Sequence, residues 1–287
     1  MWMKLKLFIT IIASALPLIS FAAETNTTST QLSASAPLSA NNGLNQANHS
    51  SCVPGEPKSS ANYNATKWYR DSAERNAQYN QIFALGLEKV SAQVKAQKLS
   101  KKSWGVIMDI DETVLDNSQY EKQELLACSS YNAKTMYTFM EQATSPATPG
   151  AHNTTCAIQK MGGKVVLVTN RDGTFDDKIQ DATVANLQNS GICFDNVVFA
   201  KGAKDSNKTP RFEAVAKGDY SQIIASGKTK PFKVLAYFGD NIQDFPNINQ
   251  KDAIKQDPYG KFYQPFGQIY FSLPNPTYGS WEGNMFN

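Results

Sequence analysis

The chain has 287 residues, of which 41% are hydrophobic and 18% charged, which is enough apolar material for a sizeable core and excludes wholesale disorder. Its formal net charge is +3, and removal of the N-terminal segment described next would leave 26 of the 28 basic residues against 25 acidic ones. This near-neutral balance gives no electrostatic reason to expect a nucleic acid polymer or an anionic membrane surface as the main partner.

The N-terminus has the pattern of a secretory signal peptide over residues 1–22. Lys4 and Lys6 form a basic start, residues 7–18 are largely apolar, and small residues precede a cut after Ala22. A membrane anchor is the alternative, but the apolar run is short and is broken by Pro17. The sequence therefore predicts an exported protein, periplasmic or extracellular, without a stable membrane anchor.

Two different segments follow this start. Residues 23–60 are rich in Ser, Asn, Thr, Ala and Pro and carry almost no large apolar side chains, which predicts a flexible leader. From Asn62 to Lys98, apolar residues recur at helical spacing, which predicts a helix with one apolar face.

The four cysteines are expected to form disulfides, because their number is even and the chain is predicted to be exported. Metal binding is the alternative, but the sequence has no Cys-x-x-Cys, and neither histidine has a companion at ligand spacing. Three pairings of Cys52, Cys128, Cys156 and Cys193 are open, and we favour a bond between Cys128 and Cys156.

Short apolar runs alternate with helical stretches after residue 102. Five of these runs are predicted strands: 104–109, 164–169, 196–200, 233–240 and 268–273. Strands that are apolar throughout and separated by helices such as 174–190 predict an α/β fold with a doubly wound parallel sheet. The stretch 121–161 is longer than one crossover helix requires. It is therefore predicted to form a small, mainly helical cap over the carboxyl edge of the sheet, where such folds bind ligands.

Three of the predicted strands end in polar residues that this topology brings to one edge. Asp109 and Asp111 point the same way from an extended chain, and two such charges need a cation or a shared proton. The run 169–171 (Thr-Asn-Arg) offers donors suited to phosphate oxygens. Asp240 and Asp244 lie one helical turn apart and suit a hard divalent ion such as magnesium.

Each of these features has an ordinary structural explanation when it is taken alone. The acidic pair fits a turn after a strand, and Thr169 or Asn170 fits a helix N-cap. A basic cluster on a loop is usually a solvated surface, and this explanation applies to Lys201, Lys204, Lys208 and Arg211. Their combination at one sheet edge predicts a site for a cation and an anionic substrate.

The segment 108–120 resembles the first motif of the haloacid dehalogenase (HAD) superfamily. More narrowly, it resembles the subfamily IIIB secreted acid phosphatases with four signature aspartates, closest to the class C bacterial group. The other matching segments are 68–74, 168–171, 208–212, 239–245 and 273–283. The similarity runs from about Tyr63 to the C-terminus, so one HAD-like phosphatase domain is expected over 61–287.

The resemblance implies roles for the four aspartates. Asp109 would be the nucleophile that forms an aspartyl-phosphate, and Asp111 would act first as general acid and then as general base. Mg²⁺ would bind the carboxylate of Asp109, the backbone carbonyl of Asp111 and Asp240, with Asp244 as a ligand or a neighbour of the ligands.

The resemblance also implies how the phosphoryl group is held. Thr169 and Asn170 would bind its oxygens, and Lys208 would neutralise Asp109 and the transferring group. Lys208 is preferred to Lys201 and Lys204, because only Lys208 matches the Lys-x-x-Arg pattern.

The sequence thus predicts a secreted, Mg²⁺-dependent acid phosphatase that hydrolyses small phosphate monoesters, with 5′-nucleotides as candidates. Two alternatives stay open: a non-catalytic binding or storage protein on the same fold, and a phosphotransferase to alcohol acceptors. Aromatic residues near the cap could stack a base, although core packing explains them equally well: Tyr120, Tyr131, Tyr137 and Phe139. The oligomeric state, a homo-oligomer included, is not fixed by the sequence.

Overall fold

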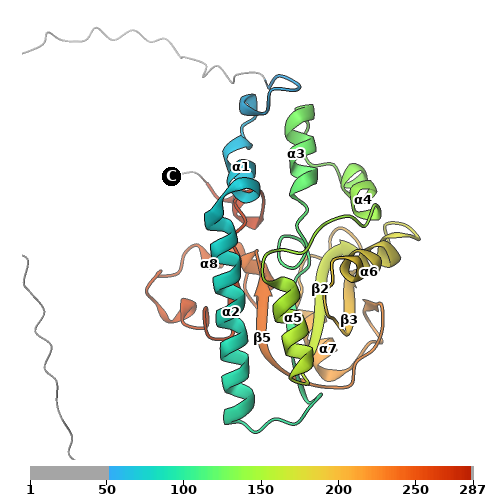
Figure 1. Cartoon of the computed structure of the whole chain (residues 1–287), viewed down its shortest axis with the longest axis vertical. Coiled ribbons are helices and arrows are strands. Elements are labelled where there is room, and N and C mark those ends of the chain that lie inside the picture. Colours follow the sequence, from blue (N-terminus) through green and yellow to red (C-terminus); the bar gives the residue numbers. More distant parts are fainter. Residues whose placement is uncertain (1–51, 286–287) are drawn as a thin grey trace, which may run out of the picture. The chain divides into compact units, whose positions relative to one another are not determined.

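The computed structural model describes residues 52–285 (Figure 1). The predicted signal peptide and residues 23–51 of the predicted leader lie outside the described residues. Over 52–285, none of the helices combines the length and apolar character that a bilayer crossing requires.

A six-stranded sheet organises the fold, in the order β4-β3-β2-β1-β5-β6. Its strands are β1 (Trp104–Met108), β2 (Lys164–Asp172), β3 (Asn196–Ala200), β4 (Ile224–Ala225), β5 (Lys233–Gly239) and β6 (Tyr270–Ser272). Every neighbouring pair is parallel except β3 and β4, which run antiparallel. The predicted doubly wound α/β fold is confirmed, and β4 was not predicted because two residues carry no periodic signal.

Helices cover both faces of this sheet. Alternate residues of β1 point to opposite faces, so Val106 packs in one core and Ile107 in the other. The first core also contains residues of α2 (Ala73–Ala96), α5 (Ala151–Lys160) and α6 (Ile179–Asn189), and the second contains residues of α7 (Thr209–Lys217). Burial on both sides explains why the central strands carry continuous apolar runs instead of an alternating pattern.

The single helix predicted over 62–98 is divided in two at Ser72. Helix α1 (Tyr63–Asp71) ends there, because Ser72 adopts an extended backbone conformation, and α2 begins at the next residue. The Ser72 hydroxyl accepts a hydrogen bond of 3.1 Å from the backbone N–H of Arg75, which caps α2. The capping hydroxyl falls inside a continuous apolar pattern, so periodicity alone does not reveal the break.

Replacing Gly86 with Ala is expected to lower the free energy of unfolding by about 1–3 kcal/mol. Helix α2 approaches the sheet so closely that a Cβ at Gly86 would lie 2.4 Å from the ring of Phe238. That ring is stacked between Phe83 and Phe271 and has no room to move. Urea unfolding measures the effect, and Gly283→Ala, with no atom near its added Cβ, is the control. Equal stability of the two variants would contradict the close packing.

The stretch predicted as a cap divides between two layers. Helices α3 (Ser118–Ala127) and α4 (Ala133–Glu141) form a small core of their own with Ile179, and Figure 1 shows them above the sheet, next to α1. Helix α5 instead buries Ala151 and Ile158 in the main core. The helical cap therefore covers 118–141 rather than 121–161.

Two disulfides are present, Cys52–Cys128 and Cys156–Cys193, so the favoured Cys128–Cys156 bond is wrong. Its two cysteines lie in different layers, since Cys128 ends α3 and Cys156 lies in α5. The predicted flexible leader also extends too far. Residues 52–60 form a turn that contains η1 (Pro57–Ser59), and the bond from Cys52 ties this turn to α3.

Short helical elements precede and follow β6 in the part of the chain after β5. They are η2 (Ile242–Asp244), α8 (Gln250–Ala253), η3 (Lys261–Tyr263) and η4 (Ser280–Gly283).

Candidate active site

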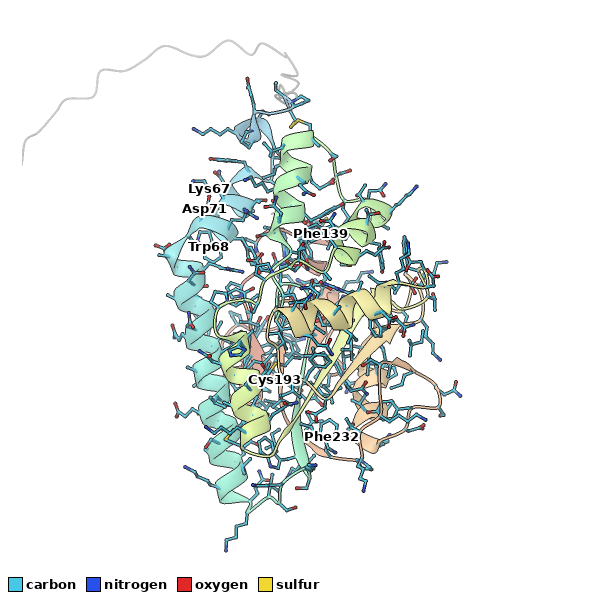
Figure 2. The ribbon with its side chains drawn as sticks, turned by 45° about the vertical axis from the view of Figure 1, so that its right-hand side comes forward. Lys67, Trp68, Asp71, Phe139, Cys193 and Phe232 are labelled. Atoms are coloured by element: carbon cyan, nitrogen blue, oxygen red, sulfur yellow. A yellow bond between two sulfur atoms is a disulfide. The ribbon has the colours of Figure 1, made fainter. Side chains whose placement is uncertain are left out.

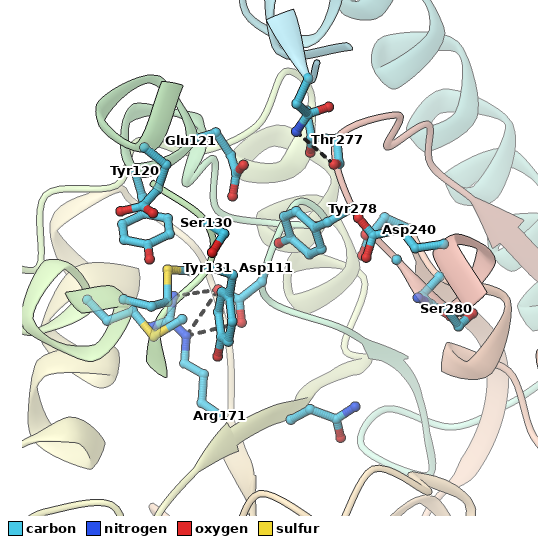
Figure 3. Close-up of a pocket in the computed structure, with 18 of the residues that line it drawn as sticks. Asp111, Tyr120, Glu121, Ser130, Tyr131, Arg171, Asp240, Thr277, Tyr278 and Ser280 are labelled. Atoms are coloured by element: carbon cyan, nitrogen blue, oxygen red, sulfur yellow. Dashed lines mark hydrogen bonds and ion pairs between the residues drawn. The ribbon is translucent and has the colours of Figure 1, made fainter. Parts of the chain in front are cut away.

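Polar residues at the carboxyl ends of β1, β2 and β5 meet at one edge of the sheet, as the topology predicts. They line a cavity of about 880 Å³ together with residues of α3, α4 and the segment 277–282 (Figure 3). Asp109, Asp111, Asn170, Lys208 and Asp240 all face this cavity, and so does Asp244. The structure therefore brings together nearly all of the predicted site residues.

A buried ion pair lies at the floor of the cavity. The Lys208 ammonium donates a hydrogen bond to the carboxylate of Asp109 and lies 2.7 Å from Oδ1 of Asp244. Burial alone would lower the pKa of Lys208, but these two carboxylates raise it, so the ammonium stays charged. Burial raises the pKa of Asp109 to about 7, opposed by the charge of Lys208.

Three carboxylates gather around this ion pair. Asp109, Asp240 and Asp244 each offer one oxygen, and these oxygens lie within 4.8 Å of one another. Burial, with repulsion from Asp244 and Asp109, raises the pKa of Asp240 well above its ordinary value. One ammonium does not balance three buried carboxylates, and an all-oxygen donor set fits a hard divalent cation.

Neighbouring polar groups fix the orientation of these carboxylates. Asp240 accepts hydrogen bonds from the Thr113 hydroxyl at 3.2 Å and from the Asn275 side-chain amide at 2.9 Å. Asp244 accepts from the backbone N–H of Asn241 at 2.9 Å, which closes the turn after β5. The oxygens are thus held in place before any ion binds.

Asp111 is held apart from this acidic group by a guanidinium. Arg171 donates from its Nη2 to Oδ1 of Asp111 at 2.7 Å (Figure 3). The Asn117 amide donates to the same oxygen at 2.6 Å. Burial alone would raise the pKa of Asp111, but Arg171 and these hydrogen bonds lower it below its ordinary value. The Asp111 carboxylate is therefore ionised and fixed in one orientation.

A family model described as HAD superfamily, subfamily IIIB (Acid phosphatase), matches residues 21–281. The chain belongs to this family. The match confirms the resemblance that the aspartate motifs indicated.

Solved structures and a named relative agree with this membership. The class C acid phosphatase of Bacillus anthracis with tungstate bound superposes with a TM-score of 0.64 and 25% identity, over 77% of this chain and 86% of that one. A second structure of that protein gives a TM-score of 0.63 at 24% identity and supports the fold. Acid phosphatase 1 of Solanum lycopersicum is 28% identical over 172 residues, 60% of this chain and 57% of that protein. The chain therefore matches somewhat over half the length of this plant relative.

The two predicted phosphate-binding residues near the end of β2 occupy different positions in this subfamily IIIB site. Asn170 is exposed and lines the cavity. Thr169 is fully buried behind it, where its hydroxyl donates to Asp111 over 3.4 Å and accepts from the backbone N–H of Arg171 at 3.1 Å. The Thr169 side chain thus supports Asp111 rather than lining the cavity.

Two basic residues that the predicted site omitted have structural partners here. Arg211 is buried and donates to the Thr169 carbonyl, and its Nη2 donates to the Asn170 side-chain oxygen at 2.6 Å. Arg171 pairs with Asp111. The sequence motifs place both arginines next to predicted site residues, because Arg171 follows Thr-Asn and Arg211 lies three residues after Lys208. Lys201 and Lys204 are exposed and do not line the cavity.

Glu112 is a buried carboxyl that the sequence analysis did not single out. It is 1% exposed, adopts a φ of 53°, and accepts a hydrogen bond of 2.8 Å from the backbone N–H of Asn117. Burial, with repulsion from Asp111 and Asp240, raises its pKa well above the ordinary value. Its backbone carbonyl accepts from the Tyr79 hydroxyl, which ties the turn after β1 to α2.

The outer part of the cavity has an aromatic and acidic wall. Tyr120, Tyr131, Tyr137 and Tyr278 line it, and Figure 3 shows Tyr131 and Tyr278 among the residues that face it. Phe139 does not line it and packs beside Tyr120 instead. Burial, with repulsion from Glu124 and Glu282, raises the pKa of Glu121 to about 7.

Proposed function

We propose that this protein is a metal-dependent acid phosphatase that hydrolyses small phosphate monoesters. One observation carries the proposal: the Asp109 carboxylate lies at the floor of an open cavity, against an ammonium and two further carboxylates. The nucleophile, the counter-charge and the oxygen donors for a cation are then within reach of one phosphoryl group.

The first step forms a covalent intermediate on Asp109. A carboxylate oxygen attacks phosphorus in line with the ester oxygen, so that an O–P bond to Asp109 forms as the ester O–P bond breaks. Asp111 gives a proton to the departing alkoxide. Lys208 and Asn170 bind the phosphoryl oxygens, on which negative charge is concentrated.

The second step releases phosphate from the aspartyl-phosphate. Asp111, now deprotonated, takes a proton from a water molecule whose oxygen attacks phosphorus, and the bond to Asp109 breaks. The ion pair with Arg171 keeps Asp111 in one place through both steps. Arg171 lowers the pKa of Asp111 and so favours its ionised form, whereas the first step needs the protonated form. Acidic solution increases the population of that protonated form.

Mg²⁺ is the proposed cofactor, with Asp109, Asp240 and the backbone carbonyl of Asp111 as ligands and Asp244 close by. When bound, the cation would neutralise the carboxylates and the equatorial phosphoryl oxygens. The close approach of three carboxylate oxygens supports this assignment.

Chelation is expected to lower kcat/KM by at least about 100-fold, because three carboxylates balanced by a single ammonium repel a phosphate dianion. Hydrolysis of p-nitrophenyl phosphate after dialysis against a chelator measures this, and added MgCl₂ should restore the rate. Parallel titrations with Mn²⁺, Zn²⁺ and Ca²⁺ identify the preferred ion. Full activity of the chelated protein would contradict the metal assignment.

The substrate class is best tested with a panel of esters from acidic to neutral pH. The aromatic wall supports 5′-nucleotides as substrates, because tyrosine rings can stack on a base. Equal kcat/KM for nucleotides and simple esters would remove the nucleotide preference. Release of less phosphate than alcohol in added glycerol would indicate transfer to an alcohol. No hydrolysis by the folded, metal-loaded protein would favour a binding or storage role.

Export to the periplasm or the extracellular space is part of the proposal. The signal pattern over residues 1–22 supports it, and so do two disulfides, since such bonds persist in oxidising compartments.

A further inference from the structure

The Cys52–Cys128 disulfide joins two segments that both line the active-site cavity. After Cys52 the chain makes a closed turn, and residues 60–62 then reach the cavity. After Cys128, which ends α3, residues 129–131 line the same cavity. The bond thus lies at the start of one segment of the wall and directly before another.

Few noncovalent interactions hold the turn of residues 52–60 against α3. Helix η1 has no buried residue, and Val53 is 42% exposed, so apolar packing contributes little there. One backbone hydrogen bond reaches across to α3, from the Gly55 N–H to the Leu126 carbonyl at 2.9 Å. The disulfide joins the same two segments covalently across 76 residues of sequence. The covalent bond is therefore the main tie between this turn and α3.

The second segment also depends on Cys128. This residue has a left-handed backbone conformation, with φ 53° and ψ 33°, which non-glycine residues seldom adopt. Tyr131 lies three residues later and is 68% exposed, so packing does not fix its ring. Cys128 constrains the segment before this ring, and hydrogen bonds between Asn132 and the Tyr120 hydroxyl constrain it after the ring.

A third segment is linked to this wall through residue 62. The Asn62 side-chain amide donates to the Thr277 carbonyl at 3.0 Å (Figure 3), and residues 277–280 line the opposite side of the cavity. The turn fixed by Cys52 therefore connects Tyr131 on one side with Tyr278 on the other.

We propose that the Cys52–Cys128 disulfide positions the wall that contacts the leaving group of the substrate. This inference rests on the proposed function, because it concerns the same cavity. The wall lies beyond Asp109 and Lys208, so its order affects the binding of large leaving groups and leaves the chemistry at phosphorus unchanged. The cysteines are positioning residues, since neither of them lines the cavity.

The other disulfide provides a matched control. Cys156–Cys193 joins α5 to the chain before β3, and neither cysteine lines the cavity; Figure 2 shows Cys193 beside α5. Its removal deletes a covalent bond of the same kind without touching the leaving-group wall.

The test compares the Cys52→Ser/Cys128→Ser protein with the Cys156→Ser/Cys193→Ser protein on two esters. For adenosine 5′-monophosphate, whose nucleoside reaches the wall, the first variant should show a KM raised about tenfold with kcat within about twofold, because side chains that were pre-ordered must be immobilised on binding. For β-glycerol phosphate both constants should stay within about twofold. The control variant should keep the wild-type ratio of KM values for the two esters.

Hydrogen exchange gives a readout that does not depend on activity. Amides of residues 129–131 should exchange faster in the Cys52→Ser/Cys128→Ser protein and at the wild-type rate in the control. If the Cys52→Ser/Cys128→Ser protein does not fold, wild-type protein whose Cys52–Cys128 bond has been selectively reduced and alkylated in the native state takes its place. Parallel KM changes for both esters, the same ratio change in the control, or unchanged exchange at 129–131 would overturn the proposal. A wild type that hydrolyses neither ester would refute the proposed function, and the exchange comparison would still test the positioning.

Discussion

Replacing Asp109 with Asn should abolish turnover, with kcat/KM reduced by at least about 10⁴-fold, as expected when a covalent nucleophile is lost. The amide has nearly the same shape as the carboxylate but is a poor nucleophile, and the cavity stays open. Steady-state hydrolysis of p-nitrophenyl phosphate with saturating MgCl₂ measures the effect. Acid quenching with ³²P-labelled substrate should trap label on the wild type and none on the variant.

Stability provides a second readout on the same variant. Burial raises the pKa of Asp109 to about 7, so between its ordinary value near 4 and pH 7 the native state binds more protons than the unfolded state. The stability of the metal-free wild type should therefore fall as pH rises through this range. The Asp109→Asn protein should show a shallower slope in urea unfolding with chelator present.

Asp257→Asn is the matched control for both measurements, because Asp257 is exposed and lies outside the cavity. It should keep wild-type activity and the wild-type pH slope. Near-normal turnover by the Asp109→Asn protein would mean that another group attacks phosphorus.

Replacing Lys208 with Met should lower kcat/KM by about 10³-fold, comparable with the loss of a key donor at a transition-state oxyanion. The ammonium is 2% exposed and contacts both Asp109 and Asp244. Without it the pKa of Asp109 should rise further, because the charge of Lys208 now opposes the effect of burial. Less of the nucleophile is then ionised at neutral pH, and the phosphoryl group loses its cationic partner.

The same substitution should lower the free energy of unfolding by about 3 kcal/mol at neutral pH in chelator, because it leaves two buried carboxylates without their counter-charge. The loss should be smaller in acid, where the Asp109 carboxyl is protonated and no longer needs a counter-charge. Lys204→Met is the control, since Lys204 is exposed and outside the cavity, and it should behave as wild type. Activity of the Lys208→Met protein within tenfold of wild type would contradict the assigned role.

Local patterns in the sequence predicted most of the scaffold. All five predicted strands lie within about three residues of their observed limits, because a strand buried on both faces carries a continuous run of apolar residues, as at 165–168. The break at Ser72 was missed because one capping hydroxyl decides it against the helical pattern on both sides. The short strand β4 was missed because its two residues are held by pairing with β3 and not by their own pattern.

The sequence predicted that the side chains of the candidate site gather at one sheet edge, and it did not predict the contacts among them. Asp109, Asp240 and Asp244 meet because parallel strands end at one edge, a consequence of topology that motif order reveals. The burial of Thr169 behind Asp111 depends on side-chain packing around Arg171, which no local pattern encodes.

The sequence by itself determined which chemical groups gather at the carboxyl edge, because strand ends follow from local hydrophobic patterns and parallel strands place their carboxyl ends at one edge. Only the tertiary structure decided which groups pair within that edge and which cysteines join. Arg171 forms an ion pair with Asp111 at the cavity, and Cys128 bonds Cys52 rather than Cys156. Such pairings depend on distances between segments remote in sequence, which are set when helices and sheet pack into one core.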